Sequence, residues 1–197
     1  MQGLTATTRC RRAAFGLVFT GFLLLGVAPA SAAQLAGVTM PPTEQADGAS
    51  LKLNGIGLRT YSILGVHIYV AALYLQSPSH SGAEVLASPG VKVIRLQFLR
   101  SVGADAIRKA WRSGLQNNCT APCTLSPALL THFLSFVTPV HKGDLVKFVF
   151  GPKGLTSYYN GHPAGRITDT SFAQLMLASF IGPHVNTPEL KRALLGQ

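Results

Sequence analysis

Acidic residues are scarce in this chain. Its 197 residues include 7 Asp and Glu against 17 Lys and Arg, which gives a formal net charge of +10. A pair of carboxylates that could act as general acid and general base is therefore hard to assemble. Charged residues make up only 12% of the chain and apolar residues 47%. This balance excludes a disordered chain and differs from nucleic-acid-binding domains, which gather many basic residues on one face.

Sequence motifs for the common cofactor and metal chemistries are also missing. There is no phosphate-binding loop of the G-x-x-x-x-G-K type, no G-x-G-x-x-G ahead of a helix and no H-E-x-x-H. The six His residues show no ligand spacing, and no G-x-S-x-G nucleophile elbow is present. We therefore expect neither a cofactor nor a metal site.

The longest apolar run lies close to the N terminus, at residues 13–27. A polar segment with three Arg and no acid precedes it, and small residues ending in Ala30-Ser31-Ala32 follow it. This is the pattern of a secretory signal peptide cleaved after Ala32. A membrane anchor is the alternative, but a bilayer span needs about 20 residues. We expect residues 1–32 to be removed and the protein to be exported, periplasmic or secreted, with 14 basic and 7 acidic residues remaining.

Cysteine is equally sparse, with three residues in the chain. Cys10 leaves with the signal peptide, whereas Cys119 and Cys123 remain close together. A metal site would need two more ligands, and no suitable partner motif exists. In an oxidising compartment this even pair favours a disulfide, and two free thiols are the alternative.

The remaining patterns predict an α+β domain over residues 51–197, preceded by an extended segment at 33–50. Alternation of apolar residues predicts strands at 51–55, 58–64, 66–75, 91–99, 144–150 and 156–160 and around 166. Helical spacing and capping residues predict helices at 83–87, 104–115, 127–138, 169–181 and 188–195. This order is typical of an antiparallel sheet with helices on one face, an arrangement that can leave a ligand cleft between the two layers.

Turn and surface signals refine this prediction. Asn54-Gly55 and Asn160-Gly161 both have the composition of tight turns. The strand at 66–75 is apolar on both faces and should be covered on both sides. Three basic residues of the 104–115 helix lie mostly away from its apolar stripe, and we expect them on a solvated face: Arg108, Lys109 and Arg112.

One charged residue stands out within the predicted sheet. Arg59 precedes a turn centred on Leu64 and Gly65, so it lies opposite residues 69–71 of the next strand. With 59 opposite 69 or 71, Arg59 and Tyr69 share a face, whereas a one-residue slip separates them. A guanidinium and a phenol together can hold a carboxylate or a phenolate. Spacing alone does not exclude the alternative that Arg59 is an ordinary surface residue and Tyr69 an ordinary core residue.

Several stretches resemble the chalcone isomerase superfamily. They are LNGIGLR followed by HIYVAALYLQS from Leu53, SFIGPHVNTPELKRALLG from Ser179, and between them FLRSV, a helix with Trp, KGD and YNG. The resemblance covers about residues 38–197 and depends on the order and spacing of the motifs. The chain is most similar to the bacterial exported, chalcone isomerase-like branch. This implies an open-faced β-sandwich, in which a large antiparallel sheet packs against a helix layer with a cleft between them.

The resemblance also implies roles for particular residues. Enzymes of the superfamily close a chalcone into a flavanone by intramolecular addition, and an Arg stabilises the reacting phenolate and enolate. Arg59 matches that Arg in the G-x-G-x-R context and would be the catalytic residue. Tyr69 stands where the enzymes have Thr, and Ser179 matches a Thr or Ser of the late helix, with Phe180 beside it.

Two further enzyme residues are replaced in this chain. The enzymes' Tyr at the start of the helix falls near Val102 or Gly103, and their Asn one turn later falls near Ala110. These losses argue against cyclisation. The non-catalytic branch binds fatty acids through an Arg and a Tyr, and Arg59 and Tyr69 can supply this pair.

The sequence therefore predicts an exported protein that binds a small hydrophobic anionic ligand, such as a fatty acid, without catalysis. A chalcone isomerase-type intramolecular lyase is the alternative, and a partner-binding protein with a vestigial cleft is a third hypothesis. Contact with an anionic membrane surface is compatible with the charge, no nucleic-acid partner is expected, and the sequence leaves the oligomeric state open. The candidate apolar walls, each of which has ordinary core packing as its alternative, are Leu73, Trp111, Phe172, Met176 and Phe180.

Overall fold

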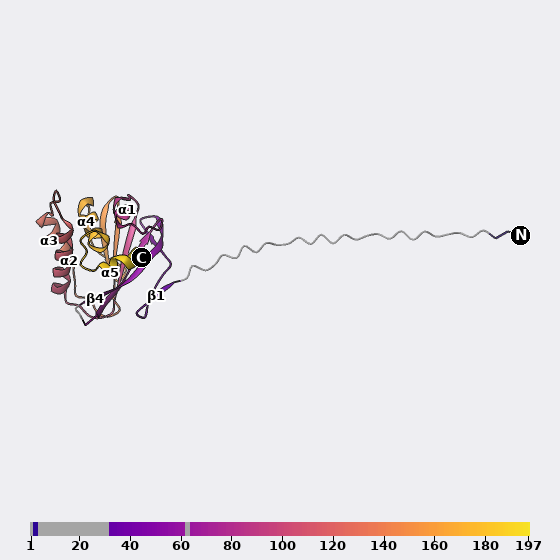
Figure 1. The fold of residues 1–197 in the computed structure, drawn as a ribbon, viewed down its shortest axis with the longest axis horizontal. Coiled ribbons are helices and arrows are strands. Elements are labelled where there is room, and N and C mark those ends of the chain that lie inside the picture. Colours follow the sequence, from indigo (N-terminus) through magenta and orange to yellow (C-terminus); the bar gives the residue numbers. More distant parts are fainter. Residues whose placement is uncertain (1, 4–31, 62–63) are drawn as a thin grey trace.

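The structure is a computed structural model that describes residues 2–3, 32–61 and 64–197. The predicted signal peptide at 1–32 lies almost wholly outside the described residues. From residue 33 onward, the chain forms an antiparallel sheet that carries a layer of helices (Figure 1).

The main sheet contains seven strands that lie side by side in chain order, each antiparallel to the next. They are β3 (Thr43–Ala46), β4 (Ala49–Tyr61), β5 (Val66–Leu75), β6 (Lys92–Phe98), β7 (Leu145–Gly151), β8 (Gly154–Tyr159) and β9 (His162–Ile167). A separate two-stranded hairpin consists of β1 (Ala33–Leu35) and β2 (Val38–Met40). The sequence patterns predict strands at the positions of β5 to β9, whereas they predict two separate strands, 51–55 and 58–64, in place of β4.

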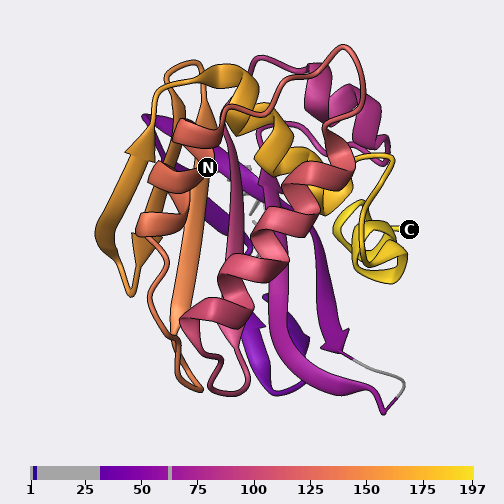
Figure 2. The same cartoon turned by 90° about the vertical axis from the view of Figure 1, so that its left-hand side faces the viewer.

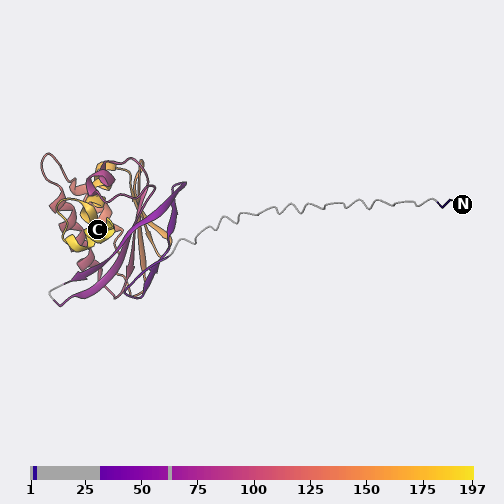
Figure 3. The same ribbon diagram turned by 45° about the vertical axis from the view of Figure 1, so that its right-hand side comes forward.

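The five helices of the described residues lie on one side of this sheet, and Figures 2 and 3 show this helix layer. They are α1 (Gly82–Ala87), α2 (Ala104–Asn118), α3 (Pro127–Ser135), α4 (Thr170–Ile181) and α5 (Pro188–Leu194). The side chains of Ser126 and Asp169 accept hydrogen bonds from backbone N–H groups in the first turns of α3 and α4 and so cap these helices. Among the described residues, no helix combines the length and the apolar composition needed to cross a bilayer.

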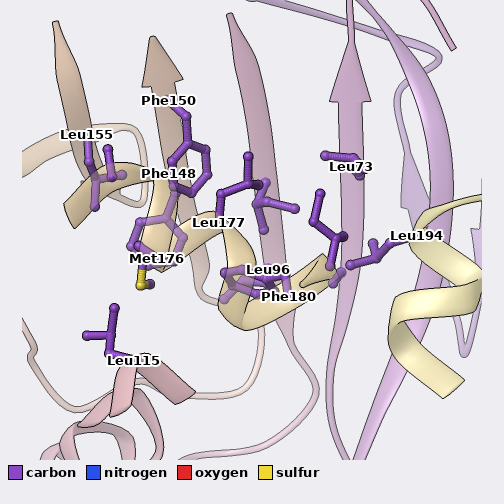
Figure 4. Packing of buried hydrophobic residues seen from close by; sticks show 14 of the residues in the cluster. Leu73, Leu96, Leu115, Phe148, Phe150, Leu155, Met176, Leu177, Phe180 and Leu194 are labelled. Atoms are coloured by element: carbon purple, nitrogen blue, oxygen red, sulfur yellow. The ribbon is translucent and has the colours of Figure 1, made fainter. Parts of the chain in front are cut away.

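The sheet buries both of its faces over its central strands. On the helix side, Leu96 and Phe148 pack against Met176 and Phe180 of α4 (Figure 4). On the opposite side, a second cluster brings β5 residues together with the β1–β2 hairpin, including Met40, which is 1% exposed. The prediction that strand 66–75 is covered on both faces is therefore confirmed.

The predicted turn at Asn54-Gly55 is wrong, because both residues lie within β4. Asn54 is an extra residue in a β-bulge opposite β5. Its side-chain amide donates hydrogen bonds to the carbonyl oxygens of Ser79 and Leu194. These two segments are distant in sequence, so a local turn signal could not reveal them. The second Asn-Gly pair forms the predicted turn, with φ values of 48° and 85° at Asn160 and Gly161.

The segment at 33–50, predicted only to be extended, forms β1, β2 and β3 with two tight turns between them. The turns are Ala36-Gly37 and Asp47-Gly48, and all four residues have positive φ. Successive positive φ values are typical of the two-residue turns that connect antiparallel strands. Asp47-Gly48 carries a recognisable hairpin signal, whereas Ala36 does not.

The loop between α2 and α3 contains the predicted disulfide. Cys119 and Cys123 are bonded, with their Cα atoms 5.1 Å apart. The alternative of two free thiols is therefore wrong.

Candidate functional site

Two glycines of β4 allow α5 to lie directly on the sheet. A Cβ atom at Gly55 would lie 2.2 Å from the carbonyl oxygen of Ala193, and one at Gly57 would lie 2.8 Å from Cδ1 of Leu190. Alternate residues of a strand point to the same face, so Gly55, Gly57 and Arg59 share the helix side of β4. Arg59 is therefore the first side chain of this face that extends past α5.

Arg59 pairs directly with Tyr69 of β5, in the register predicted from the hairpin length. Directly opposed residues have Cβ atoms about 5 Å apart, so the two side chains stand next to each other. Tyr69 in turn pairs with Phe98 of β6, and their rings meet edge to face with centroids 5.4 Å apart. Three adjacent strands thus present a guanidinium, a phenol and a phenyl ring in one row.

A cavity of about 460 Å³ lies between this row and the helix layer. Its volume falls within the range of small-molecule sites, about 300–1,000 Å³. Strands β4 to β6 form one wall, and α2, the end of α4 and the start of α5 form the other. All five residues predicted to contact a ligand line this cavity: Arg59, Tyr69, Trp111, Ser179 and Phe180.

The cavity is mostly apolar, and its charged groups have one sign. Arg59 and Lys109 line it, whereas none of the carboxylates in the described residues does. Neither cation forms an ion pair with another described residue. The described part of the chain also contains no cluster of three or more His, Cys, Asp or Glu side chains that could hold a metal ion. The cavity therefore has positive charge available for an anionic ligand.

Tyr69 is half-buried beside Arg59. Burial raises the pKa of Tyr69 to about 12, although the positive charge of Arg59 acts in the opposite direction. The phenol is therefore protonated at neutral pH and can donate a hydrogen bond. Within the described ranges its hydroxyl makes no hydrogen bond, so this donor is available to a bound molecule.

Ser179 lies where α2 and α4 come closest. Its hydroxyl donates a hydrogen bond to the carbonyl oxygen of Met176, 2.6 Å away, so only its oxygen lone pairs can serve a ligand. A Cβ atom at Gly114 would lie 3.1 Å from Cβ of Ser179. The small residue at 114 therefore allows the two helices to approach each other at the cavity wall.

Trp111 forms the inner wall together with Phe180, with ring centroids 5.5 Å apart. Three other predicted wall residues do not line the cavity: Leu73, Phe172 and Met176 are buried in the core instead. Leu73 lies four residues farther along β5 than Tyr69, and the other two lie at least one helical turn before Phe180. The cavity occupies the end of the sheet near the β4–β5 turn, and these residues lie beyond it.

The prediction of a solvated basic face on α2 is confirmed for Lys109 and Arg112, which are exposed, but not for Arg108. Lys109 also lines the cavity, where small neighbours such as Ala106 and Ala110 leave room. Arg108 donates hydrogen bonds to the carbonyl oxygens of Leu134 and Val137 at the end of α3. The small residues on one face of α2 are a pattern from which this part of the cavity wall could have been predicted. The partners of Arg108 could not, because they depend on how α2 and α3 pack.

The lining also includes Val102 and Ala110, at or near the positions where the resemblance places the enzymes' Tyr and Asn. Both side chains are apolar and can neither donate nor accept a hydrogen bond. At these two positions the cavity wall therefore carries apolar side chains in place of the polar ones that the resemblance implies for the enzymes.

A large antiparallel sheet, a helix layer on one face and a cavity between them that is lined by two cations define an open-faced sandwich. The chain belongs to the chalcone isomerase-like family, whose model matches residues 32–196. A fatty-acid binding protein from Arabidopsis thaliana has the same fold, with a TM-score of 0.67 and 17% sequence identity over 81% of this chain and 92% of that one. No curated protein sequence matches this chain. The predicted fold class is confirmed.

Proposed function

We propose that this protein binds a fatty acid or a similar amphiphilic carboxylate in the cavity between the sheet and the helices, without transforming it. The observation that carries the proposal is the guanidinium of Arg59 beside the hydroxyl of Tyr69 in a mostly apolar cavity, since neither group has an ion-pair or hydrogen-bond partner among the described residues. The family and the fold of the Arabidopsis fatty-acid binding protein support the same reading.

The two polar side chains match the shape of a carboxylate. The planar guanidinium can donate two parallel hydrogen bonds to its oxygens, and the phenol adds a third donor. The alkyl chain then lies along Trp111 and Phe180. Each methylene that leaves water contributes about 0.8 kcal/mol, so the apolar wall supplies much of the affinity.

Removal of the guanidinium tests the site directly. We expect Arg59→Ala to weaken binding of a fatty acid about 10- to 100-fold, because hydrogen bonds to a charged group contribute about 1.5–3 kcal/mol. Isothermal titration calorimetry measures this change, and Arg166→Ala, which removes an exposed Arg of β9, is the matched control. Equal affinity in the Arg59 variant and the wild type would contradict the proposal.

Removal of the phenol hydroxyl tests the second contact. Tyr69→Phe keeps the ring that packs on Phe98 and deletes only the donor. We expect affinity for the carboxylate to fall about 10-fold, whereas binding of the corresponding fatty alcohol changes less, since the hydrogen bond is then to a neutral group. An equal loss of affinity for the fatty acid and the fatty alcohol would mean that the carboxylate does not bind at Tyr69.

Cyclisation of a chalcone is the competing function for Arg59. With Val102 and Ala110 in the lining, the groups that would assist the reaction are missing, and we expect no Arg59-dependent rate. An absorbance assay with the substrate chalcone at high protein concentration measures this. A rate above background that disappears in Arg59→Ala would replace binding by catalysis as the function.

We further propose that the protein belongs to the exported branch of the family and works in the periplasm or outside the cell. The bonded pair Cys119–Cys123 supports an oxidising compartment, and the pattern of residues 1–32 supports secretion. N-terminal sequencing of protein expressed from the full chain should find Ala33 first. Recovery of Met1 at the N terminus of the exported protein would contradict cleavage.

A further inference from the structure

The tip of the β4–β5 hairpin exposes apolar surface beside the cavity. Across residues 32–61 and 64–197, Tyr61 and Leu64 are the large hydrophobic side chains that remain exposed, at 67% and 84%. The hairpin extends beyond the lower edge of the helix layer in Figure 2. Tyr61 also lines the cavity, so this exposed tip adjoins the cavity mouth.

Charge is distributed unequally between the two ends of the sheet. Because the strands are antiparallel, the β4–β5 hairpin tip lies at the same end of the sheet as three other segments. These are the segment after β6, the segment before β7 and the turn between β8 and β9. Four of the seven acidic residues lie at the opposite end: Glu44, Asp47, Glu84 and Asp169. The other three carboxylates already have partners. Asp105 pairs with Arg108 at 3.0 Å, Asp144 accepts hydrogen bonds from its neighbours, and Glu189 at the start of α5 pairs with Arg192 at 3.8 Å.

Basic residues at the hairpin end remain available. Four of them form no ion pair with any residue that the structure describes: Arg59, Arg100, Lys109 and Lys142. Three are exposed, and Arg59 is half-buried in the cavity. The exposed side chains of Tyr61 and Leu64 therefore lie at the end of the sheet that has uncompensated positive charge, while the far end is close to neutral.

We propose that this end of the molecule docks on an anionic lipid bilayer, with Tyr61 and Leu64 at the level of the headgroups and the four cations facing the lipid phosphates. Tyrosine is favoured at the membrane–water boundary, and each Lys or Arg near an anionic surface contributes about 1 kcal/mol. In this orientation the cavity mouth faces the membrane, so an amphiphile can pass between the bilayer and the protein. The transfer of a ligand depends on the proposed function, whereas the docking itself does not.

Vesicle co-sedimentation tests the docking with the mature protein. We expect binding to phosphatidylcholine vesicles that contain phosphatidylglycerol, little binding to phosphatidylcholine alone, and a decrease as salt rises. Any protein this basic is attracted to anionic lipid to some extent. The test therefore compares variants that lose the same amount of charge at different ends of the molecule. Lys142→Gln with Arg100→Gln removes two charges at the hairpin end, and Lys153→Gln with Arg166→Gln removes two exposed charges at the far end.

The paired charge variants have opposite expected outcomes. The hairpin-end pair should weaken vesicle binding about 10-fold or more, on the basis of about 1 kcal/mol for each residue. The far-end pair should leave it within about twofold of wild type. Equal losses in the two pairs would overturn the proposal, because binding would then follow net charge and not this surface.

The apolar tip has its own test. A tryptophan introduced as Leu64→Trp should shift its emission to the blue when anionic vesicles are added, whereas Lys153→Trp at the far end should not. Leu64→Ser should reduce vesicle binding but leave binding of a soluble short-chain fatty acid unchanged, since Leu64 does not line the cavity. No blue shift at position 64 would overturn the proposed orientation.

The two proposals fail in distinguishable ways. Vesicle binding without fatty-acid binding would overturn the proposed ligand and keep the docking surface. Fatty-acid binding without binding to vesicles of either composition would overturn the docking and keep the proposed ligand.

Discussion

Trp111 separates the ligand cavity from a second, smaller cavity of about 50 Å³. Phe98, Ile107 and Trp111 line both, so these three side chains form the partition between them. A chain that enters at Arg59 meets this partition at its far end. The size of residue 111 should therefore limit the length of the alkyl chain that fits.

Shortening this side chain should change ligand preference. We expect Trp111→Leu to join the two cavities and to shift the tightest-binding fatty acid toward longer chains, measured by titration with a series of acids. Loss of aromatic packing will also destabilise the protein, so thermal unfolding must show that the variant is folded. Trp111→Phe, which keeps a ring in the partition, should retain the wild-type preference. An unchanged preference in the Leu variant would place the chain elsewhere.

Asp144 has the most clearly lowered carboxyl pKa in the described chain. Hydrogen bonds from Tyr159, Asn160 and the backbone N–H of His141 lower the pKa of Asp144 to about 2. A carboxyl whose pKa is lower in the folded state stabilises the fold above its unfolded value, near pH 3.8. That contribution is lost as the pH falls from about 4 to about 2.

Replacement by the neutral amide should remove this acid sensitivity. We expect Asp144→Asn to lower the free energy of unfolding at neutral pH by about 1–2 kcal/mol, because charge-assisted hydrogen bonds are lost. The difference between variant and wild type should narrow between pH 4 and pH 2. Urea unfolding at several pH values measures both effects, and a difference that does not depend on pH would contradict the role of the charge.

At the scale of elements, the packing of α5 on β4 depends on the two glycines of the G-x-G-x-R motif. Gly57→Ala would place a methyl group 2.8 Å from side-chain atoms of α5. Relief of such overpacking costs about 1–3 kcal/mol and should move α5, which carries part of the cavity wall. We expect lower stability and weaker ligand binding together, measured by denaturant unfolding and titration.

The control for this change is Gly103→Ser. Nothing lies within 4 Å of a Cβ atom at Gly103, which is the N-cap of α2. Serine is favoured at that position, so we expect stability to stay the same or rise slightly. If Gly57→Ala is equally neutral, the glycines of β4 do not set the position of α5.

The elements and part of the site follow from local sequence patterns. The strands from β4 to β9 and all five helices have clear periodicity or capping residues, and the Arg59–Tyr69 pair follows from the length of a single hairpin. The bulge at Asn54 could not be predicted, because its hydrogen-bond partners lie at residues 79 and 194. The place of Lys109 at the cavity likewise depends on how α2 sits on the sheet, which no local pattern specifies.

At the scale of the whole molecule, a ligand that binds only the folded protein must stabilise it. With free fatty acid at about 100 times its Kd, the gain is about 2.7 kcal/mol, which corresponds to a rise in Tm of about 5–10 °C for a chain of this size. We expect this shift for the wild type and almost none for Arg59→Ala at the same ligand concentration. A similar shift in both would indicate binding outside the cavity.

The chain order of the sheet separates the assembly of the fold from the completion of the site. Every strand from β3 to β9 pairs with the next strand in the chain. Most of these pairs have short connections and cost little loop-closure entropy, whereas α2 and α3 separate β6 from β7. The cavity instead requires α5 to return to β4, where the bond from Asn54 to Leu194 spans 140 residues. The cavity is therefore complete only when the end of the chain has returned to its first long strand, whereas most of the sheet can form without it.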